Sequence, residues 1–184
     1  MSKIKLPHAS GNSVSIAAPE SNPAADRTLY LPSNADGTIL TTTYGPTFFA
    51  RNNNNQTIGS GSTTKVEFDT ELWDSDGCYD HSSNYRFTPN LAGYYLIIGN
   101  LQLSGMSGTM GLNIYKNGSR FVNMDKNSSG SGGQSLCITS LVAFNGSSDY
   151  VEIYVYQASG SNKNLTNGNQ YSVTEFSGQF VRGL

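Results

Sequence analysis

Acidic side chains gather in one stretch of this chain, and their spacing raises the question of hydrolytic chemistry. Six carboxylates lie within fourteen positions: Glu67, Asp69, Glu71, Asp74, Asp76 and Asp80. Two placed carboxylates can cleave a glycosidic bond. Most of these residues, however, alternate with apolar ones along a single strand-like segment and its turn. We therefore expect a polar, solvated surface here rather than a glycosidase site.

The turn Asp74-Ser75-Asp76-Gly77 is the one candidate for a metal ion. It offers hard oxygen ligands and a turn glycine, as a calcium loop does. It lacks the further spaced acids and the terminal glutamate that complete such a loop. The sequence therefore predicts no resident metal and no cofactor, with calcium at Asp74 and Asp76 as a minor alternative.

Histidine-dependent catalysis would have to use one of two residues, His8 or His81. His8 lies in a segment interrupted by proline and glycine, and His81 lies in the polar stretch 80–84, where a solvated histidine is the expected reading. The sequence contains no Gly-x-Ser-x-Gly, His-Glu-x-x-His or Gly-x-x-x-x-Gly-Lys motif. We expect the protein not to be an enzyme.

Charge and hydropathy argue against two classes of partner. The formal net charge is -2 and 13% of the residues are charged, so no cationic surface is predicted that could neutralise phosphates. The longest apolar run, Tyr94–Ile98, is too short to cross a membrane, and no apolar signal core follows Met1. We expect a soluble chain without an export signal that neither binds nucleic acid nor inserts into a membrane.

The elements that carry these residues are predicted to be strands. Gly, Ser, Asn and Thr supply 79 of the 184 residues, whereas Lys and Glu supply 11, a balance that disfavours helices. Apolar residues alternate with polar ones from residue 47 onward, which is typical of half-buried strands. The predicted inward residues are Val66, Phe68, Leu72, Phe87, Tyr95, Ile97, Leu101, Leu103, Met110, Leu112 and Ile114. Asn117-Gly118 predicts a tight hairpin turn toward 121–122.

Further strands are expected at 136–144, 150–156 and 171–181, separated by Gly/Ser/Asn loops. Such spacing favours an all-β sandwich or jelly roll. Before Gly45-Pro46 the pattern differs, with short strand-like pieces at 4–6, 13–16, 28–31 and 38–40 set apart by Pro and Gly. The sequence therefore predicts an extended, β-rich N-terminal arm, 1–45, followed by a globular head, 46–184.

Several motifs of the second part occur in a recognisable order. They are Phe49-x-Arg51, Val66-Glu67-Phe68-Asp69, Gly77-x-Tyr79-Asp80, Phe87-Thr88-Pro89, Gly93-Tyr94-Tyr95-Leu96 and Phe176-Ser177-Gly178-Gln179-Phe180. In combination they resemble the globular head of the complement C1q family, which shares a trimeric jelly roll with the tumour-necrosis-factor ligands. The resemblance implies a homotrimeric jelly-roll head. No Gly-X-Y collagen stalk precedes it, which argues against a secreted complement role.

Two smaller departures accompany the missing stalk. Pro89 stands where a cysteine often follows Phe-Thr, and the Gly-Asp before the late strands is spread into Gly146-Ser147-Ser148-Asp149. The N-terminal part is similar to something else. Leu6-Pro7-His8-Ala9-Ser10-Gly11, Asp26-Arg27-Thr28-Leu29-Tyr30-Leu31-Pro32 and Asp36-Gly37-Thr38-Ile39-Leu40 are similar to repeats in structural proteins of tailed bacteriophages, marine and cyanobacterial ones especially.

Together the two resemblances imply a non-enzymatic bacteriophage structural protein on the virion surface. The arm is expected to become ordered on copies of itself or on a major capsid or other virion protein, the alternative being a free tail. A capsid decoration, cement or head-fibre role is preferred. The alternative is a tail-fibre or receptor-binding tip that recognises a host surface glycan or protein.

Three sets of residues carry these expectations. For virion attachment they are Leu6, Val14, Ile16, Leu29, Leu31, Ile39 and Leu40, whose burial would supply the affinity. For the trimer interface they are Tyr94, Tyr154, Tyr156 and Phe180, because 11 Tyr, 8 Phe and one Trp exceed what one small sandwich can hide. For receptor contact they are the loop residues Asn52, Asn53, Asn54, Ser128 and Gly130, whose amides and hydroxyls suit saccharides.

Overall fold

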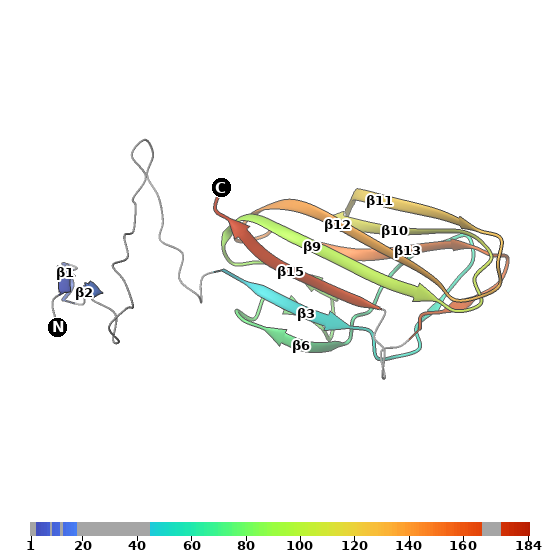
Figure 1. Cartoon of the computed structure of the whole chain (residues 1–184), viewed down its shortest axis with the longest axis horizontal. Helices are drawn as coiled ribbons and strands as arrows, with labels where there is room; N and C mark the ends of the chain where they lie inside the picture. The colour runs from blue at the N-terminus through green and yellow to red at the C-terminus, as the bar shows by residue number, and fades with distance from the viewer. Residues whose placement is uncertain (1–2, 8, 12, 18–44, 167–173) are drawn as a thin grey trace, which may run out of the picture. The chain divides into compact units, whose positions relative to one another are not determined.

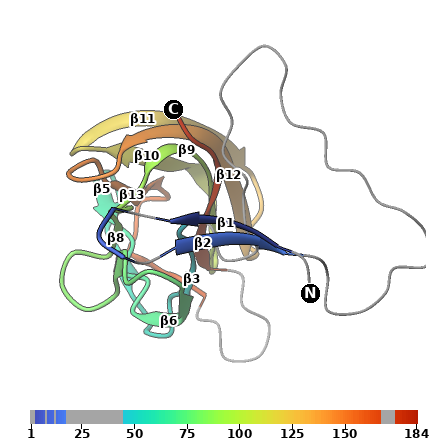
Figure 2. The ribbon, with the colours of Figure 1, turned by 90° about the vertical axis from the view of Figure 1, so that its left-hand side faces the viewer.

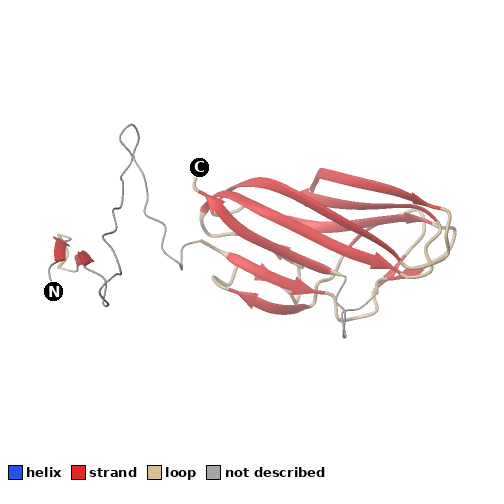
Figure 3. Cartoon of the chain, in the orientation of Figure 1, coloured by secondary structure: helices blue, strands red, loops and turns tan. Residues whose placement is uncertain are grey.

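The computed structural model describes residues 3–7, 9–11, 13–17, 45–166 and 174–184 of the chain. All regular structure in these ranges is strand (Figure 3), so the prediction of an all-β protein is confirmed. No helix in the described part is long and apolar enough to cross a membrane. The chain divides into two compact units, Met1–Thr42 and Thr43–Leu184, close to the predicted boundary at residue 45.

The first unit contains one antiparallel hairpin, β1 (Lys3–Pro7) paired with β2 (Ser13–Ala17). Its register sets apolar positions opposite each other, with Ile4 facing Ile16 and Leu6 facing Val14 across the ladder. These strands match the predicted pieces 4–6 and 13–16. Each strand satisfies one edge of its backbone on the other, without a partner chain.

The second unit is a sandwich of two antiparallel sheets. Figure 1 shows its strands from the side, and Figure 2 looks roughly along them. The first sheet has the strand order β12 (Gln134–Asn145), β9 (Ala92–Leu103), β15 (Glu175–Arg182), β3 (Thr47–Arg51) and β6 (Thr70–Asp74). The second sheet has the order β11 (Ser119–Ser128), β10 (Gly108–Lys116), β13 (Val151–Ala158), β8 (Arg86–Phe87) and β7 (Tyr79–Asp80), and β5 (Thr63–Lys65) also pairs with β13. A short pair joins β14 (Lys163–Asn164) to β4 (Thr57–Ile58).

The core between the sheets holds the side chains that the two-residue alternation predicts. All the inward residues expected on β9 and β10 are fully buried: Tyr95, Ile97, Leu101, Leu103, Met110, Leu112 and Ile114. Phe48 lies at the centre of an aromatic cluster, with ring centroids 4.4 Å from Phe87 and 4.8 Å from Phe176. Gly178 faces this cluster, and a Cβ there would lie 2.7 Å from Phe48 Cε1. A side chain at Gly178 would therefore displace the Phe48 ring at the centre of the aromatic cluster.

The segment after β5 departs from the prediction. Val66 and Phe68 are fully buried as expected, but Leu72 is 45% exposed. The expected single strand is two strands, β5 and β6, which belong to different sheets. Residues 66–69 cross between the layers, which buries Val66 and Phe68, whereas Leu72 lies on a strand at the edge of the first sheet.

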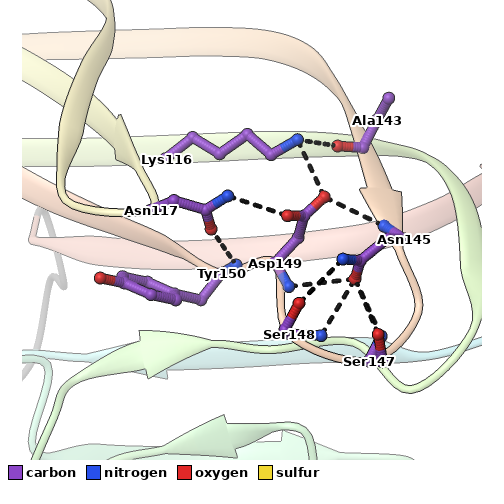
Figure 4. A network of polar contacts seen from close by, with 8 residues as sticks. All are labelled: Lys116, Asn117, Ala143, Asn145, Ser147, Ser148, Asp149 and Tyr150. Carbon is purple, nitrogen blue, oxygen red and sulfur yellow. Dashed lines mark hydrogen bonds and ion pairs between the residues drawn. The ribbon is translucent and has the colours of Figure 1, made fainter.

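The predicted hairpin turn between β10 and β11 is confirmed. Asn117 and Gly118 both have positive φ, 51° and 77°, as a tight turn of this kind requires. The turn is tied to the loop between β12 and β13 by a polar network (Figure 4). Asn117 Nδ2 donates to Asp149 Oδ1 at 2.8 Å, and the Tyr150 amide donates to Asn117 Oδ1 at 2.9 Å. Lys116 Nζ lies 3.0 Å from Asp149 Oδ2.

Candidate functional site

The outer face of the first sheet carries an apolar surface that the strand register assembles. The pairing aligns one residue from each strand into a row across the sheet. One row reads Thr139, Ile98, Ser177, Phe49 and Trp73, and the next reads Leu141, Leu96, Gln179 and Thr47. Because side chains alternate along a strand, all of these residues face away from the core. We call the surface formed by Phe49, Trp73, Tyr94, Leu96, Ile98 and Leu141 the apolar face.

Large side chains stand in solvent on the apolar face. Phe49 and Trp73 stack with ring centroids 4.9 Å apart and an interplanar angle of 16°. Trp73 is 53% exposed, Leu141 58% and Tyr94 41%. A groove of about 260 Å³ runs beside the stack, and its lining includes Leu96, Ile98 and Gln179 but no charged side chain. An uncharged patch with exposed aromatic anchors has the composition of a subunit contact rather than of a catalytic centre.

The four residues predicted for the trimer interface do not form one surface. Tyr94 lies on the apolar face, at the end of the sheet where Ala143 is its partner. Phe180 packs against the core of its own head, with its ring 5.3 Å from that of Tyr95. Tyr154 and Tyr156 belong to β13, in the opposite sheet. A contact between subunits of a trimer joins different surfaces of two copies, so the assignment of Tyr94, Tyr154 and Tyr156 to the interface stays a prediction.

Sequence reasoning missed most of the apolar face, although one signal was present. The strand at 94–103 carries apolar residues on both sides, including Leu96 and Ile98 on its outer side. Phe49 was noted only as part of a motif, and Trp73 only as the single tryptophan. The rows that join them depend on pairing between distant segments, such as Ser177 with Phe49.

The predicted receptor loops have different surroundings. Asn52 is fully buried, with Nδ2 donating to the Glu67 carbonyl at 2.6 Å, so the expectation that it contacts a receptor is wrong. Its role is to hold the chain before the crossing segment. Asn53 and Asn54 are exposed, but both are hydrogen-bonded to Asp69. Ser128 ends β11 and is half-buried, and Gly130 is exposed in the loop that follows.

The acidic segment uses its carboxylates to close turns. Asp74 Oδ2 accepts a hydrogen bond from the Tyr79 amide at 2.6 Å, and Asp76 accepts one from Ser75 Oγ. Asp80 accepts the amides of residues 82, 83 and 84 at 2.9–3.1 Å. Desolvation raises the pKa of Asp80, but these hydrogen bonds together outweigh it and hold the pKa well below its usual range. Among the described residues no group of three or more His, Cys, Asp or Glu side chains could hold a metal ion.

The structure describes one of the two histidines, His81. His81 is exposed, and its Nδ1 lies 3.3 Å from Glu71 Oε2, which is also partly exposed. His8 lies outside the described residues. No nucleophile is hydrogen-bonded to the His81 ring in the described part of the chain. A surface pair such as His81 and Glu71 contributes little to the free energy of unfolding.

The attachment residues divide between the hairpin and the segment after it. Leu6, in β1, is 55% exposed. Val14 and Ile16 lie in β2, paired with Leu6 and Ile4. Leu29, Leu31, Ile39 and Leu40 lie outside the described residues, so their role stays a prediction.

Comparison with known proteins assigns the fold. No family model matches the chain, and no curated protein matches it. Among solved structures, it is similar to murine APRIL at pH 5.0, with a TM-score of 0.59 and 10% identity over 75% of this chain and 100% of that one. It is also similar to the globular domain of zebrafish complement 1qA (TM-score 0.55, 14% identity, 76% and 99% covered) and to Eiger TNF from S. frugiperda (0.59, 7%, 76% and 93%).

These similarities define the class of the head. It is a jelly roll of the kind shared by tumour-necrosis-factor and C1q-like domains, as the motifs in its sequence predict. Identities of 7–14% establish this fold and leave partners and location to be inferred from the surface of this chain.

Proposed function

We propose that the chain is a non-enzymatic structural protein of a bacteriophage virion, in which three heads associate through the apolar face and the N-terminal arm attaches to the particle. The observation that carries the association is the Phe49–Trp73 stack, which stands half-exposed beside an uncharged groove. Burial of apolar surface contributes about 25 cal/mol per Å². An exposed patch of this composition therefore favours a partner that covers it.

A second and a third copy of the chain are the occupants that the head favours. The apolar face has no charged side chain in its groove to select a charged partner, and 13% charged residues overall give little repulsion between copies. The resemblance to C1q heads implies the same stoichiometry. Tyr94 extends the face, and its hydroxyl can pair at the rim of such a contact.

Attachment through the arm is supported by its sequence and by its hairpin. The motifs around Asp26–Pro32 and Asp36–Leu40 are similar to those of tailed-phage structural proteins. β1 and β2 pair only with each other among the described strands, so each has an outer edge free to add a strand from a partner. A short arm suits a place on the capsid, as a decoration, cement or head-fibre protein. A tail fibre usually needs a long shaft.

A tail-fibre or receptor-binding tip is the second candidate. It is favoured by the exposed amides of Asn53 and Asn54 and by the exposed loop around Gly130, which suit hydrogen bonding to a host glycan or protein. Both candidates share the trimeric head and differ in which end faces the host.

Two measurements test the proposal. Sedimentation equilibrium of the full chain at micromolar concentration should give three times the mass of one chain, and a monomer would refute the association. Gold-labelled antibody against the head should mark purified phage particles. Label over the capsid supports the preferred role, label at the tail tip supports the second candidate, and unlabelled particles would show that the chain is not a virion protein.

A further inference from the structure

The outer face of the second sheet carries a polar hollow that no expectation from the sequence included. The register places Thr63, Tyr156, Gly111 and Asp125 in one row across β5, β13, β10 and β11. The hollow has a volume of about 280 Å³ and is lined by Thr63, Thr109, Asn113, Arg120, Asp125 and Tyr156. This is close to the small end of the range for small-molecule sites, roughly 300–1,000 Å³.

Gly111 makes room for the Asp125 carboxylate that borders this hollow. A Cβ at this position would collide with Asp125 Oδ1 and would lie 3.7 Å from Tyr156 Cβ. Its φ is not positive, so the backbone does not require glycine here. Glycine weakens a strand interior and often marks a place where something approaches the backbone closely. The missing side chain therefore supplies the space that the Asp125 carboxylate occupies, beside Tyr156, rather than a turn.

The polar groups around Gly111 retain capacity for hydrogen bonds. Asn113 is only 4% exposed, and the one hydrogen bond of its side chain to another described residue is a long one, 3.4 Å from Nδ2 to the Tyr154 carbonyl. The Arg120 guanidinium forms no hydrogen bond or ion pair within the described part of the chain. Asp125 accepts one from Asn123 at 3.2 Å. A buried amide with a weak partner, next to a free guanidinium and a carboxylate, is poised to bind a ligand.

Aromatic rings flank these groups. Tyr156 lines the hollow and is half-buried. Beside it on the same face, Tyr154 and Tyr115 pack with ring centroids 4.2 Å apart. The lining holds no leucine, isoleucine, valine or methionine side chain, so it offers little aliphatic surface for a protein partner to bury. The combination of one aromatic surface with converging amide, guanidinium and carboxylate groups suits a ring that has C–H bonds on its face and hydroxyls at its edge.

We propose that this hollow binds a neutral saccharide unit, with Tyr156 beneath the sugar ring and with Asn113, Arg120 and Asp125 hydrogen-bonded to its hydroxyls. Neutrality follows from the lining, in which one cation and one anion offset each other. The site lies on the sheet opposite the apolar face. It also differs from the loops at residues 52–54 and 128–130.

The test uses the intact chain and an array of oligosaccharides that separates neutral hexose and N-acetylhexosamine units from uronic-acid and sialic-acid units. Wild-type protein is expected to bind at least one neutral glycan, and calorimetric titration with that glycan gives its Kd. Gly111→Ala, which displaces the Asp125 carboxylate, and Arg120→Ala, which removes a charged donor, should each weaken binding roughly tenfold or more. Gly111→Ala should keep the melting temperature close to that of wild type, because the atom that its Cβ meets is the end of the exposed Asp125 side chain, which can rotate away.

Lys126→Ala is the matched control, since Lys126 is an exposed cation on the same strand and does not line the hollow. It should keep the wild-type Kd within about twofold, well under the tenfold that 1.4 kcal/mol represents. Three results would overturn the proposal: no binding to any neutral glycan, binding to acidic glycans alone, or binding that the Gly111→Ala and Arg120→Ala proteins retain at wild-type strength. The last result would place saccharide recognition elsewhere, for example on the loops.

Discussion

Lys65 and Glu152 form an ion pair inside the head, with Lys65 Nζ 2.7 Å from Glu152 Oε1. The Glu152 side chain is 6% exposed and that of Lys65 30%. Lys65 Nζ also donates to the Asn84 carbonyl at 3.1 Å. The pair therefore joins β5 to β13 and reaches the loop that leads into β8, which fixes the short strand against the edge of the polar hollow.

Breaking this pair should destabilise the head strongly. Lys65→Met leaves the Glu152 carboxylate buried without its cation, which costs about 3 kcal/mol in the free energy of unfolding. Urea denaturation of the wild-type and variant proteins measures the difference. The double variant Lys65→Met/Glu152→Leu should recover part of the loss, because it removes both charges. A single variant as stable as wild type would show that water reaches Glu152 in solution.

The Asp149 network predicts a dependence of stability on pH. The hydrogen bond from Asn117, opposed by desolvation and aided by Lys116, lowers the pKa of Asp149 from its ordinary 3.8. A lowered folded-state pKa gives stability that is present above the unfolded pKa, near 4, and that is lost as the pH falls through the folded pKa. Asp149→Asn should therefore be less stable than wild type at pH 7, by about 1–2 kcal/mol.

The difference between wild type and Asp149→Asn should shrink as the pH falls below about 4. Glu67→Gln is the control, because Glu67 is exposed and its carboxylate has no hydrogen-bond partner among the described residues. Its stability should follow the wild-type curve at every pH. A constant gap between wild type and Asp149→Asn from pH 7 to pH 3 would argue against a titration of this carboxylate.

Removal of divalent cations should leave the head unchanged. Asp74 already binds the backbone amides of Tyr79 and Asp76, so its oxygens serve the turn without a metal. EDTA is expected to shift neither the melting temperature nor the sedimentation coefficient. A rise in melting temperature on addition of calcium, lost in Asp74→Asn, would instead establish the calcium site that the sequence offers as its minor alternative.

The strands and the hairpin turn of this head can be predicted from its sequence, whereas the apolar face and the polar hollow cannot. Alternation of apolar residues identifies β9 and β10, and Asn117-Gly118 identifies their hairpin turn, because both signals lie within a few neighbouring residues. The apolar face and the polar hollow depend on which strands become neighbours. Glu175 pairs with Arg51 across the sheet, and nothing in either local segment specifies the other.

The burial of two residues, Asn52 and Leu72, differs from what the sequence pattern predicts. Asn52 stands in a run of four asparagines and reads as an exposed loop, yet the fold covers it and uses its amide to bind the Glu67 carbonyl. Leu72 reads as a core residue by alternation with Phe68 and is exposed, because the chain changes sheets between them. The alternation of apolar and polar residues keeps its period of two through the segment that passes between the sheets. The sequence pattern alone therefore does not show where the chain changes sheets.

Deletion of residues 1–44 should separate attachment from association. The two units are each compact, so the truncated chain is expected to fold, to keep its trimeric mass and to lose incorporation into particles. The physical reason is that β1, β2 and the apolar positions beyond them are gone, while the apolar face is intact. Complementation of a phage that lacks the gene, followed by gel analysis of purified particles, measures incorporation. Truncated protein at wild-type occupancy would make the head the anchor.

The single tryptophan reports on the proposed contact between heads. Trp73 is the only tryptophan of the chain and is 53% exposed in one head, so burial by a neighbouring subunit should shift its emission to shorter wavelength and protect it from iodide. Leu141→Glu places a charge on the same face, at 58% exposure. We expect it to weaken association by roughly a hundredfold, since an unpaired charge is costly to bury.

Phe121→Glu is the matched control for this experiment, because Phe121 is 48% exposed on β11 in the opposite sheet. It should keep the trimeric mass and the blue-shifted, iodide-protected emission of wild type. Leu141→Glu should sediment as a folded monomer, with the emission and quenching of an exposed tryptophan and with an unchanged far-ultraviolet spectrum. If Leu141→Glu and Phe121→Glu behave alike, whether both remain trimeric or both dissociate, the apolar face is not the surface that joins the heads.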